Sequence, residues 1–141
     1  MTTREQIIVE AREYLGTRFQ HQARLKGVRV DCVGLVAGVA LELGLTTKDD
    51  DSTRYPRRPN GKLVAGLVRA GFREIEVADA VPGDLLVFWI LPTFKKPQHL
   101  GIKTEYGMIH TDADVGRVVE VQVVGEWVDR ICGAYAFPGV T

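Results

Sequence analysis

Cysteine and histidine are the residue types in this chain that could supply a nucleophile and its base. Cys32 stands in the segment RVDCVGLVAGVALELGL (29–45), and the chain has only three histidines, His21, His99 and His110. A thiolate is a strong nucleophile and a thiol a weak one, so a catalytic cysteine requires a neighbouring base that takes its proton. Nucleophilic catalysis by Cys32 is therefore the hypothesis, on condition that a histidine lies beside it.

The spacing of His99 and His110 predicts that their rings meet. Both stand on predicted strands that flank the turn around TEYG. In a hairpin with a two- or four-residue loop, paired residue numbers sum to an odd value, and 99 plus 110 is odd, so both rings project from one face. A three-residue loop would separate them. A helix packed on that face could bring Cys32 to the pair, which predicts a line of Cys32, His99 and His110.

Each member of this line has an expected role. Asp31 is a plausible N-cap, which places Cys32 in the first turn of a helix. A helix N-terminus and an adjacent imidazolium both stabilise a thiolate and lower the pKa of a cysteine. His99 is the expected base, and His110 would fix the tautomer and orientation of the His99 ring. The backbone N–H of Cys32 could face a developing oxyanion.

The elements that position these residues begin with a predicted N-terminal helix. Thr3 and Gln6 have the spacing of a capping box, and apolar residues then recur at helical spacing until Gly16. Residues 17–30 follow neither a helical nor a strand period. We expect them to form a loop that leads into the Cys32 helix.

Two more helices are predicted in the first half of the chain. The Cys32 helix ends at Gly44, and the polar, proline-bearing residues 46–60 form a surface connection. Asn60 is the expected cap of a short helix that ends at Gly71.

The second half of the chain changes to a period of two. Six short β-rich runs are separated by turn residues: FREIEV, DLLVFWIL, HLGIKT, GMIHTD, RVVEVQV and CGAYAF. Helices followed by strands predict an α+β fold, with the N-terminal helices packed on a C-terminal antiparallel β-sheet.

Composition narrows the class of protein. A chain of 141 residues fits one domain, so residues 1–141 are predicted to form a single domain. Eighteen basic and eighteen acidic residues cancel, which argues against nucleic acid and anionic membranes as partners. No apolar run approaches the ~20 residues that span a bilayer, and charges interrupt the N-terminal segment, so no signal peptide is predicted. We therefore expect synthesis in the cytoplasm.

Several segments together resemble a known family. YLGTRF, VDCVGLV, VPGDLLVF, HLGI and GMIHT occur in this order across residues 11–111. They look like the NlpC family of papain-like cell-wall cysteine peptidases. RFQHQARLKGVRVDCVGLV and YPRRPNGKL are most similar to its phage-type branch, which includes tail-associated and gene-transfer-agent peptidases.

The resemblance implies a papain-like fold and a catalytic triad of Cys32, His99 and His110. It also implies a substrate class, amide bonds in peptidoglycan stem peptides, and no cofactor or metal. Phage tail proteins are implied partners. The protein could therefore reach the cell wall as part of a virion or particle or be released by lysis, or it could act as a recycling enzyme in the cytoplasm.

Some residues depart from the family pattern. Phe19, in GTRF, stands where members usually carry a tyrosine, and Val33 follows the cysteine in place of a serine. An oxyanion donor could come from His21 or its glutamine neighbours on the same loop. Asp31, His21 and Phe19 are the predicted substrate-binding residues.

Two other functions remain open on the sequence alone. A catalytically weak or inactive structural or binding module of a phage tail tip would keep the fold without turnover, and Phe19 favours it. A metal site built from Cys32, His99, His110 and Cys132 has suitable ligand types but no short ligand pair. For Cys132 itself, core packing is the expected role, although one disulfide with Cys32 is also compatible with the sequence.

Overall fold

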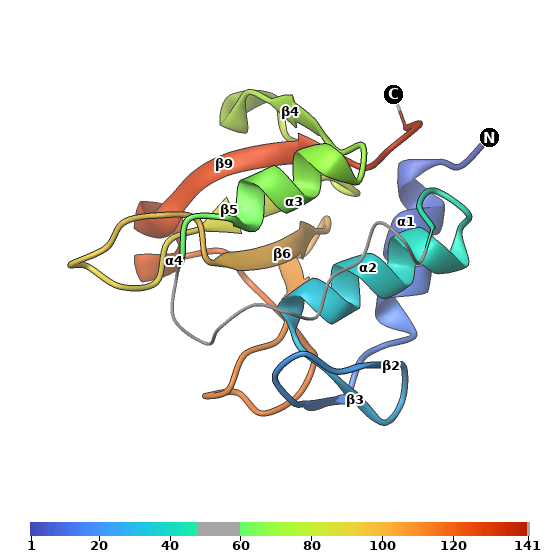
Figure 1. Ribbon diagram of the computed structural model, residues 1–141, viewed down its shortest axis with the longest axis horizontal. Helices are drawn as coiled ribbons and strands as arrows, with labels where there is room; N and C mark the ends of the chain where they lie inside the picture. The colour runs from blue at the N-terminus through green and yellow to red at the C-terminus, as the bar shows by residue number, and fades with distance from the viewer. Residues whose placement is uncertain (48–59, 141) are drawn as a thin grey trace.

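A central antiparallel sheet with helices packed against both of its faces makes up the fold in a computed structural model that describes residues 1–47 and 60–140 (Figure 1). The expected α+β class is confirmed. Its helices are α1 (Arg4–Arg12), α2 (Cys32–Glu42), α3 (Leu63–Arg69) and α4 (Glu126–Arg130), with a 3-10 turn, η2 (Val77–Asp79). Among the described residues, none of the helices has the length and apolar content needed to cross a membrane.

All six predicted strands are present in the large sheet, in the order β4-β9-β5-β6-β7-β8. They are β4 (Arg73–Ile75), β5 (Leu85–Phe88), β6 (His99–Lys103), β7 (Met108–His110), β8 (Val119–Val121) and β9 (Ile131–Ala136). Every neighbouring pair in this sheet is antiparallel.

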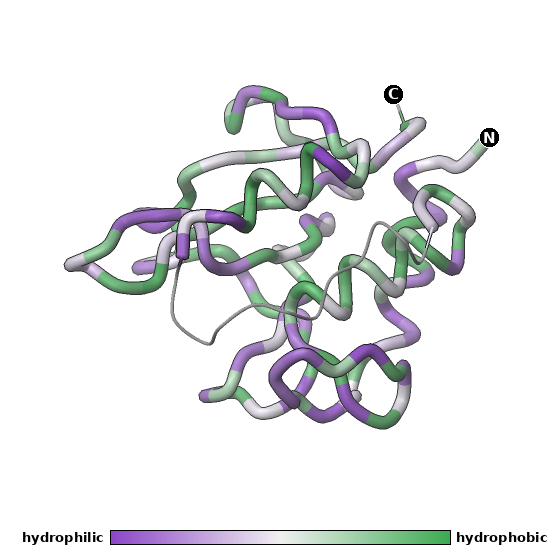
Figure 2. Tube along the Cα trace, viewed as in Figure 1, coloured by the Kyte–Doolittle hydropathy of each residue, from purple (hydrophilic) through white to green (hydrophobic). Residues whose placement is uncertain are grey.

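The two faces of this sheet pack against different elements. Leu85 and Val87 of β5 join α1, α2 and α3 in one hydrophobic cluster, whereas Leu86 and Phe88 join a second cluster that includes Trp127 of α4. Because side chains alternate along a strand, β5 is buried on both faces. Figure 2 shows α2 as a mainly hydrophobic trace, as expected for a helix that lies against the sheet.

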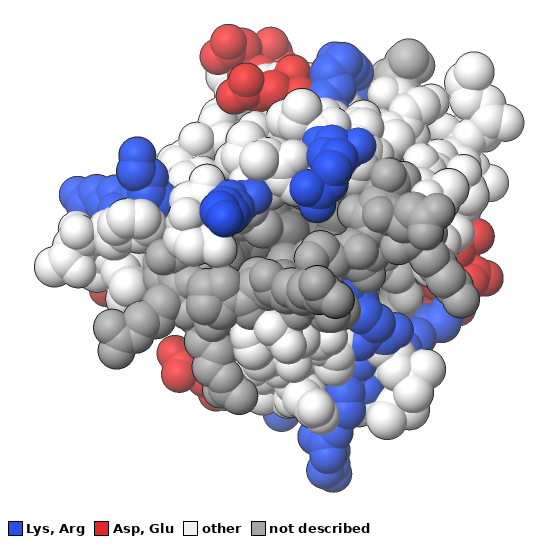
Figure 3. All heavy atoms as spheres, viewed as in Figure 1, with Lys and Arg blue, Asp and Glu red and all other residues white. Residues whose placement is uncertain are grey.

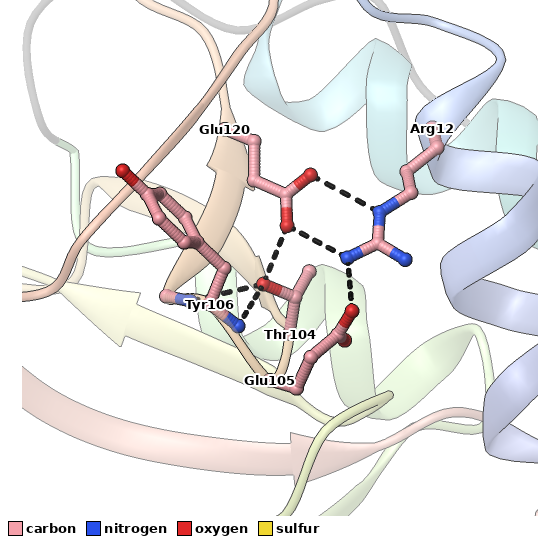
Figure 4. A network of polar contacts seen from close by, with 6 residues as sticks. Arg12, Thr104, Glu105, Tyr106 and Glu120 are labelled. Atoms are coloured by element: carbon pink, nitrogen blue, oxygen red, sulfur yellow. Dashed lines mark hydrogen bonds and ion pairs between the residues drawn. The ribbon is translucent and has the colours of Figure 1, made fainter.

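The turn between β6 and β7 is held by a polar network (Figure 4). Thr104 Oγ1 accepts hydrogen bonds from the backbone N–H groups of Tyr106 (3.2 Å) and Gly107 (3.0 Å), and it donates to Glu120 of β8 (2.8 Å). Arg12 of α1 donates to both oxygens of Glu120, at 3.1 and 2.9 Å, and also to Glu105. Residues 104–107 thus form a four-residue loop, and Lys103 pairs with Met108.

The predicted loop of residues 17–30 is a small sheet instead. Its strands are β1 (Arg18–Phe19), β2 (Arg24–Leu25) and β3 (Arg29–Val30), in the order β1-β3-β2. The prediction was wrong because two-residue strands are too short to show a sequence period, and their pairing depends on contacts distant along the chain.

Two helix starts and one helix end agree with the sequence, whereas α1 ends at Arg12, four residues before the predicted end at Gly16. Thr3 and Gln6 form the predicted capping box, and Gly44 follows α2 with a positive φ of 71°. Asn60, however, does not cap α3: its side chain accepts from the N–H of Lys62, the residue that precedes the helix. Of the predicted connection 46–60, residues 48–59 lie outside the described residues.

Gly34 allows α2 to approach the small sheet. A Cβ at this position would clash with the backbone carbonyl oxygen of Ala23, which cannot swing away as a side-chain tip can. In α3, by contrast, a Cβ at Gly66 would meet nothing within 4 Å. An alanine is therefore expected to disturb the packing at Gly34 and to be accommodated at Gly66.

We predict that Gly34→Ala lowers the free energy of unfolding by about 1–3 kcal/mol, because the Ala23 backbone must move. Gly66→Ala is the matched control and should raise it by up to about 1 kcal/mol through helix propensity. Urea denaturation of both variants measures the effect. Equal stabilisation by the two substitutions would contradict the close contact at Gly34.

Candidate active site

The two predicted strand histidines are in contact. His99 begins β6 and His110 ends β7, and the four-residue loop gives the odd pairing sum that puts both rings on one face. His99 Nε2 lies 2.9 Å from His110 Nδ1, and the two residues are 3% and 1% exposed. The contact uses Nε2 of His99, which leaves its Nδ1 for another partner.

The helix that carries Cys32 packs on the other face of the sheet from the one predicted. Packed on α2 are Leu100 and Ile102 of β6, which alternate with His99 and therefore lie on the opposite face of the strand. The backbone of Leu100 lies close enough to the Cys32 sulfur to lower the pKa of the thiol. The sulfur thus lies beside the backbone of His99, at the end of the sheet where β7 stops at His110.

Asp31 shapes the start of the cysteine helix. Its Oδ1 accepts from the Gly34 N–H (2.7 Å) and pairs with Arg24 (3.0 Å), and its Oδ2 accepts from the Gln22 N–H (2.7 Å). The predicted N-cap is confirmed. Gln22 has a φ of 65°, a left-handed conformation rare outside glycine, which the bond to Asp31 helps to hold.

The other predicted substrate-binding residues line the small sheet and its turn. Phe19 of β1 is half-buried, and its N–H donates to the Gly116 carbonyl at 2.9 Å. His21 is half-buried in the turn that follows. Their roles toward a substrate, like that of Asp31, stay predictions.

Cys132 is exposed on β9, so the expectation of core packing was wrong. Cys132 lies at a register shift, since Val87 of β5 pairs with Gly133 and Phe88 with Ile131, while Ala134, Tyr135 and Ala136 further along are buried. Both cysteines are free thiols, with no disulfide between them.

Burial, rather than the helix N-terminus, dominates the electrostatics of Cys32. Although the residue keeps some exposure, the surroundings of its sulfur raise the pKa of Cys32 to about 12 through desolvation and, second, the charge of Asp31. Hydrogen bonds from Leu100 and Val33 act in the opposite direction without reversing the shift. The predicted lowering of this pKa is therefore not met, and the group is a thiol at neutral pH.

Burial also keeps the histidine pair neutral. Desolvation and the neighbouring His110 lower the pKa of His99 well below its usual range, and desolvation lowers the pKa of His110. The negative charge of Asp112 raises the pKa of both. A neutral imidazole can accept a proton during a reaction, whereas an imidazolium cannot.

Sequence reasoning missed two residues that surround the pair. Asp112 has a carboxylate oxygen within 4.8 Å of a ring nitrogen of each histidine. Trp127 of α4 stacks on His99, with centroids 5.3 Å apart, and meets His110 edge-on at 5.0 Å. Alternation after His110 could have indicated Asp112, whereas the five-residue α4 is too short to give a helical period.

Among the described residues, His99, His110 and Asp112 are also the group whose ligand atoms lie close enough to hold a metal ion. This set differs from the predicted one, because neither Cys32 nor Cys132 belongs to it. The two facing nitrogens of the histidines are engaged in their mutual 2.9 Å contact.

No protein-family model and no curated protein matches this chain. Solved structures do. The chain is similar to the NlpC/p60 domain of the peptidoglycan hydrolase SagA, with a TM-score of 0.64, 24% identity, and coverage of 96% of this chain and 100% of that one. An NlpC/P60 family protein from Bacillus cereus ATCC 10987 aligns with a TM-score of 0.72, 18% identity, and 96% and 40% coverage.

A third similar structure is the P60 domain of an antigen from M. avium subspecies paratuberculosis, with a TM-score of 0.61, 18% identity, and coverage of 95% and 93%. The chain thus spans whole NlpC/P60 domains but about two fifths of the larger B. cereus protein. These likenesses confirm the papain-like, NlpC-type fold.

The buried histidine pair predicts a pH-dependent stability. The pKa of His99 is lower in the folded state than its unfolded value of about 6.5, so its contribution to stability is complete above that pH and is lost as pH falls. His99→Gln should therefore make the free energy of unfolding fall less steeply between pH 6 and 4, by at most about 1.4 kcal/mol per pH unit. Urea denaturation across this range measures the slope, and an unchanged slope would contradict a neutral His99.

Proposed function

We propose that this protein is a cysteine peptidase that hydrolyses amide bonds in peptidoglycan stem peptides, with Cys32 as nucleophile, His99 as base and His110 as the orienting residue. The observation that carries the proposal is the 2.9 Å contact between two buried, neutral histidines, one of which begins the strand on which the Cys32 helix packs. The likeness to an NlpC/p60 domain of a peptidoglycan hydrolase supports the substrate class.

The geometry suggests how a proton would move. With His99 Nε2 donating to His110 Nδ1, the Nδ1 of His99 carries a lone pair and can take the proton of the Cys32 thiol as the sulfur attacks the amide carbon. His99 then gives this proton to the leaving amine, and a thioester remains. Water hydrolyses the thioester, its proton passing to His99 and then to the thiolate that leaves.

The surrounding residues support this transfer. Trp127 and Phe88, with ring centroids 5.3 and 5.9 Å from that of His99, restrict the orientation of its ring. Asp112 favours the imidazolium that forms during the reaction, because its charge raises the pKa of both histidines. The first-turn N–H of Cys32 lacks an intrahelical acceptor and is our candidate donor to the oxyanion.

We further propose that the protein acts as part of a phage or gene-transfer-agent tail, since the segments around Cys32 and residues 55–63 resemble that branch. Mass spectrometry of purified tailed particles from the producing cell tests this association. Its absence from such particles would leave lysis or cytoplasmic recycling as the route.

The nucleophile can be tested against a matched thiol. We expect Cys32→Ala to abolish hydrolysis of a synthetic stem peptide, because the proposed thioester forms on the Cys32 sulfur. Cys132→Ala removes an exposed thiol on β9 and should retain full activity. Liquid chromatography of the peptide products measures both. A parent protein that binds peptidoglycan without turnover would instead indicate a binding module.

Asp112 offers a second test through the pH profile. Asp112→Asn removes a charge that raises the pKa of His99, so this pKa should fall further. The acid limb of kcat/KM should then move to lower pH by up to about one unit, and the plateau rate should fall because His99 becomes a weaker base. An unshifted acid limb would show that Asp112 does not act on the catalytic histidine.

A further inference from the structure

Three arginines lie side by side across the small sheet. Arg18 of β1 is the register partner of Arg29 of β3, and on its other side it forms an antiparallel bridge with Arg117. Backbone hydrogen bonds fix this second register: Val118 N–H donates to Thr17 (2.8 Å) and Phe19 N–H to Gly116 (2.9 Å). We call Arg117, Arg18 and Arg29 the arginine strip.

The strip occupies the open face of a one-sided sheet. Register partners point to the same side, and their chain neighbours point to the other. On that other side, Thr17, Val30 and Val118 are at most 3% exposed. Arg18 and Arg117 are exposed, and Arg29 is half-buried. Figure 3 shows basic side chains gathered at the part of the surface where Figure 1 places β2 and β3.

The charges of the strip are not balanced within the described part of the chain. Nearby Arg12, Arg24 and Lys26 form ion pairs with acidic residues, whereas no ion pair involves a member of the strip there. Like charges directly opposite each other in a sheet are destabilising. An anionic ligand bound between the three guanidinium groups would remove this repulsion.

The residue type indicates the ligand chemistry. Guanidinium groups bind phosphate with two parallel hydrogen bonds, and adjacent strands lie about 5 Å apart, so the strip presents three such groups over roughly 10 Å. That length suits successive phosphates of a linear polymer. Leu25, the register partner of Arg29, is apolar and 61% exposed. The strip itself contains no aromatic ring on which a nucleobase could stack, so a nucleic acid is not the favoured polymer.

We propose that the arginine strip is a binding site for a phosphodiester polymer of the cell envelope, which would hold the domain near its substrate. The choice of an envelope polymer rests on the proposed peptidase function, while the anion site itself does not. The formal net charge of the chain is zero, which argues against a broad positive potential over the whole surface but is compatible with a local positive charge at the arginine strip.

Binding of a poly(glycerol phosphate) oligomer to the Cys32→Ala protein tests the site without turnover. Three phosphate contacts predict that affinity falls about 20-fold as salt rises from about 50 to about 200 mM. The triple variant Arg18→Gln, Arg29→Gln, Arg117→Gln should lose most of the affinity at low salt together with this salt dependence. The control triple Lys62→Gln, Arg69→Gln, Lys96→Gln removes equal charge elsewhere on the exposed surface and should bind like the parent.

Two readouts separate this proposal from its alternatives. Thermal unfolding should show the strip variant at least as stable as its parent, because repulsion is relieved, and hydrolysis of a phosphate-free stem peptide should be unchanged. Equal loss of binding in both triples, or no binding by the parent, would overturn the site. Tighter binding of a single-stranded oligonucleotide with the same number of phosphates would overturn the envelope polymer as its ligand.

Discussion

The register of the β6–β7 hairpin is the constraint on which the rest of the site depends. A shift of one residue would send His110 to the α2 side of the sheet and end its contact with His99. The four-residue loop prevents this shift because Thr104 binds its backbone and Glu120 binds Thr104. Arg12 ties the same carboxylate to α1, so the first helix of the chain supports a turn that is nearly a hundred residues away.

Burial then determines the chemistry that this register permits. The histidine pair is enclosed by Trp127 and Phe88, and desolvation keeps both rings neutral. The same effect keeps Cys32 a thiol. A thiol with a neutral imidazole and a thiolate with an imidazolium carry the same total charge, so proton transfer between them adds no net charge to the buried site. The charge of Asp112 favours the imidazolium form and raises the pKa of His99, which opposes the effect of desolvation on that pKa.

Much of the fold could be predicted from the sequence, because it depends on local signals. The capping box at Thr3, the N-cap at Asp31 and the alternation of six strands each involve neighbouring residues, and the parity of His99 and His110 follows from one loop length. The side of the sheet on which α2 packs could not be predicted, since it depends on which face of β6 is apolar in three dimensions. The small sheet, Trp127 and the exposed Cys132 likewise depend on contacts between distant segments.

The two halves of the candidate site differ in how far apart they lie along the chain, which affects the order in which they can form. His99 and His110 are 11 residues apart and meet within one hairpin, a unit that closes on a timescale of about 1–10 μs. Cys32 reaches β6 only when α2 has docked on the sheet, since Cys32 and Leu100 are 68 residues apart along the chain. Under the proposed mechanism, a chain whose hairpin has formed but whose α2 has not docked would hold the base without the nucleophile, so reactivity would require the docking of α2.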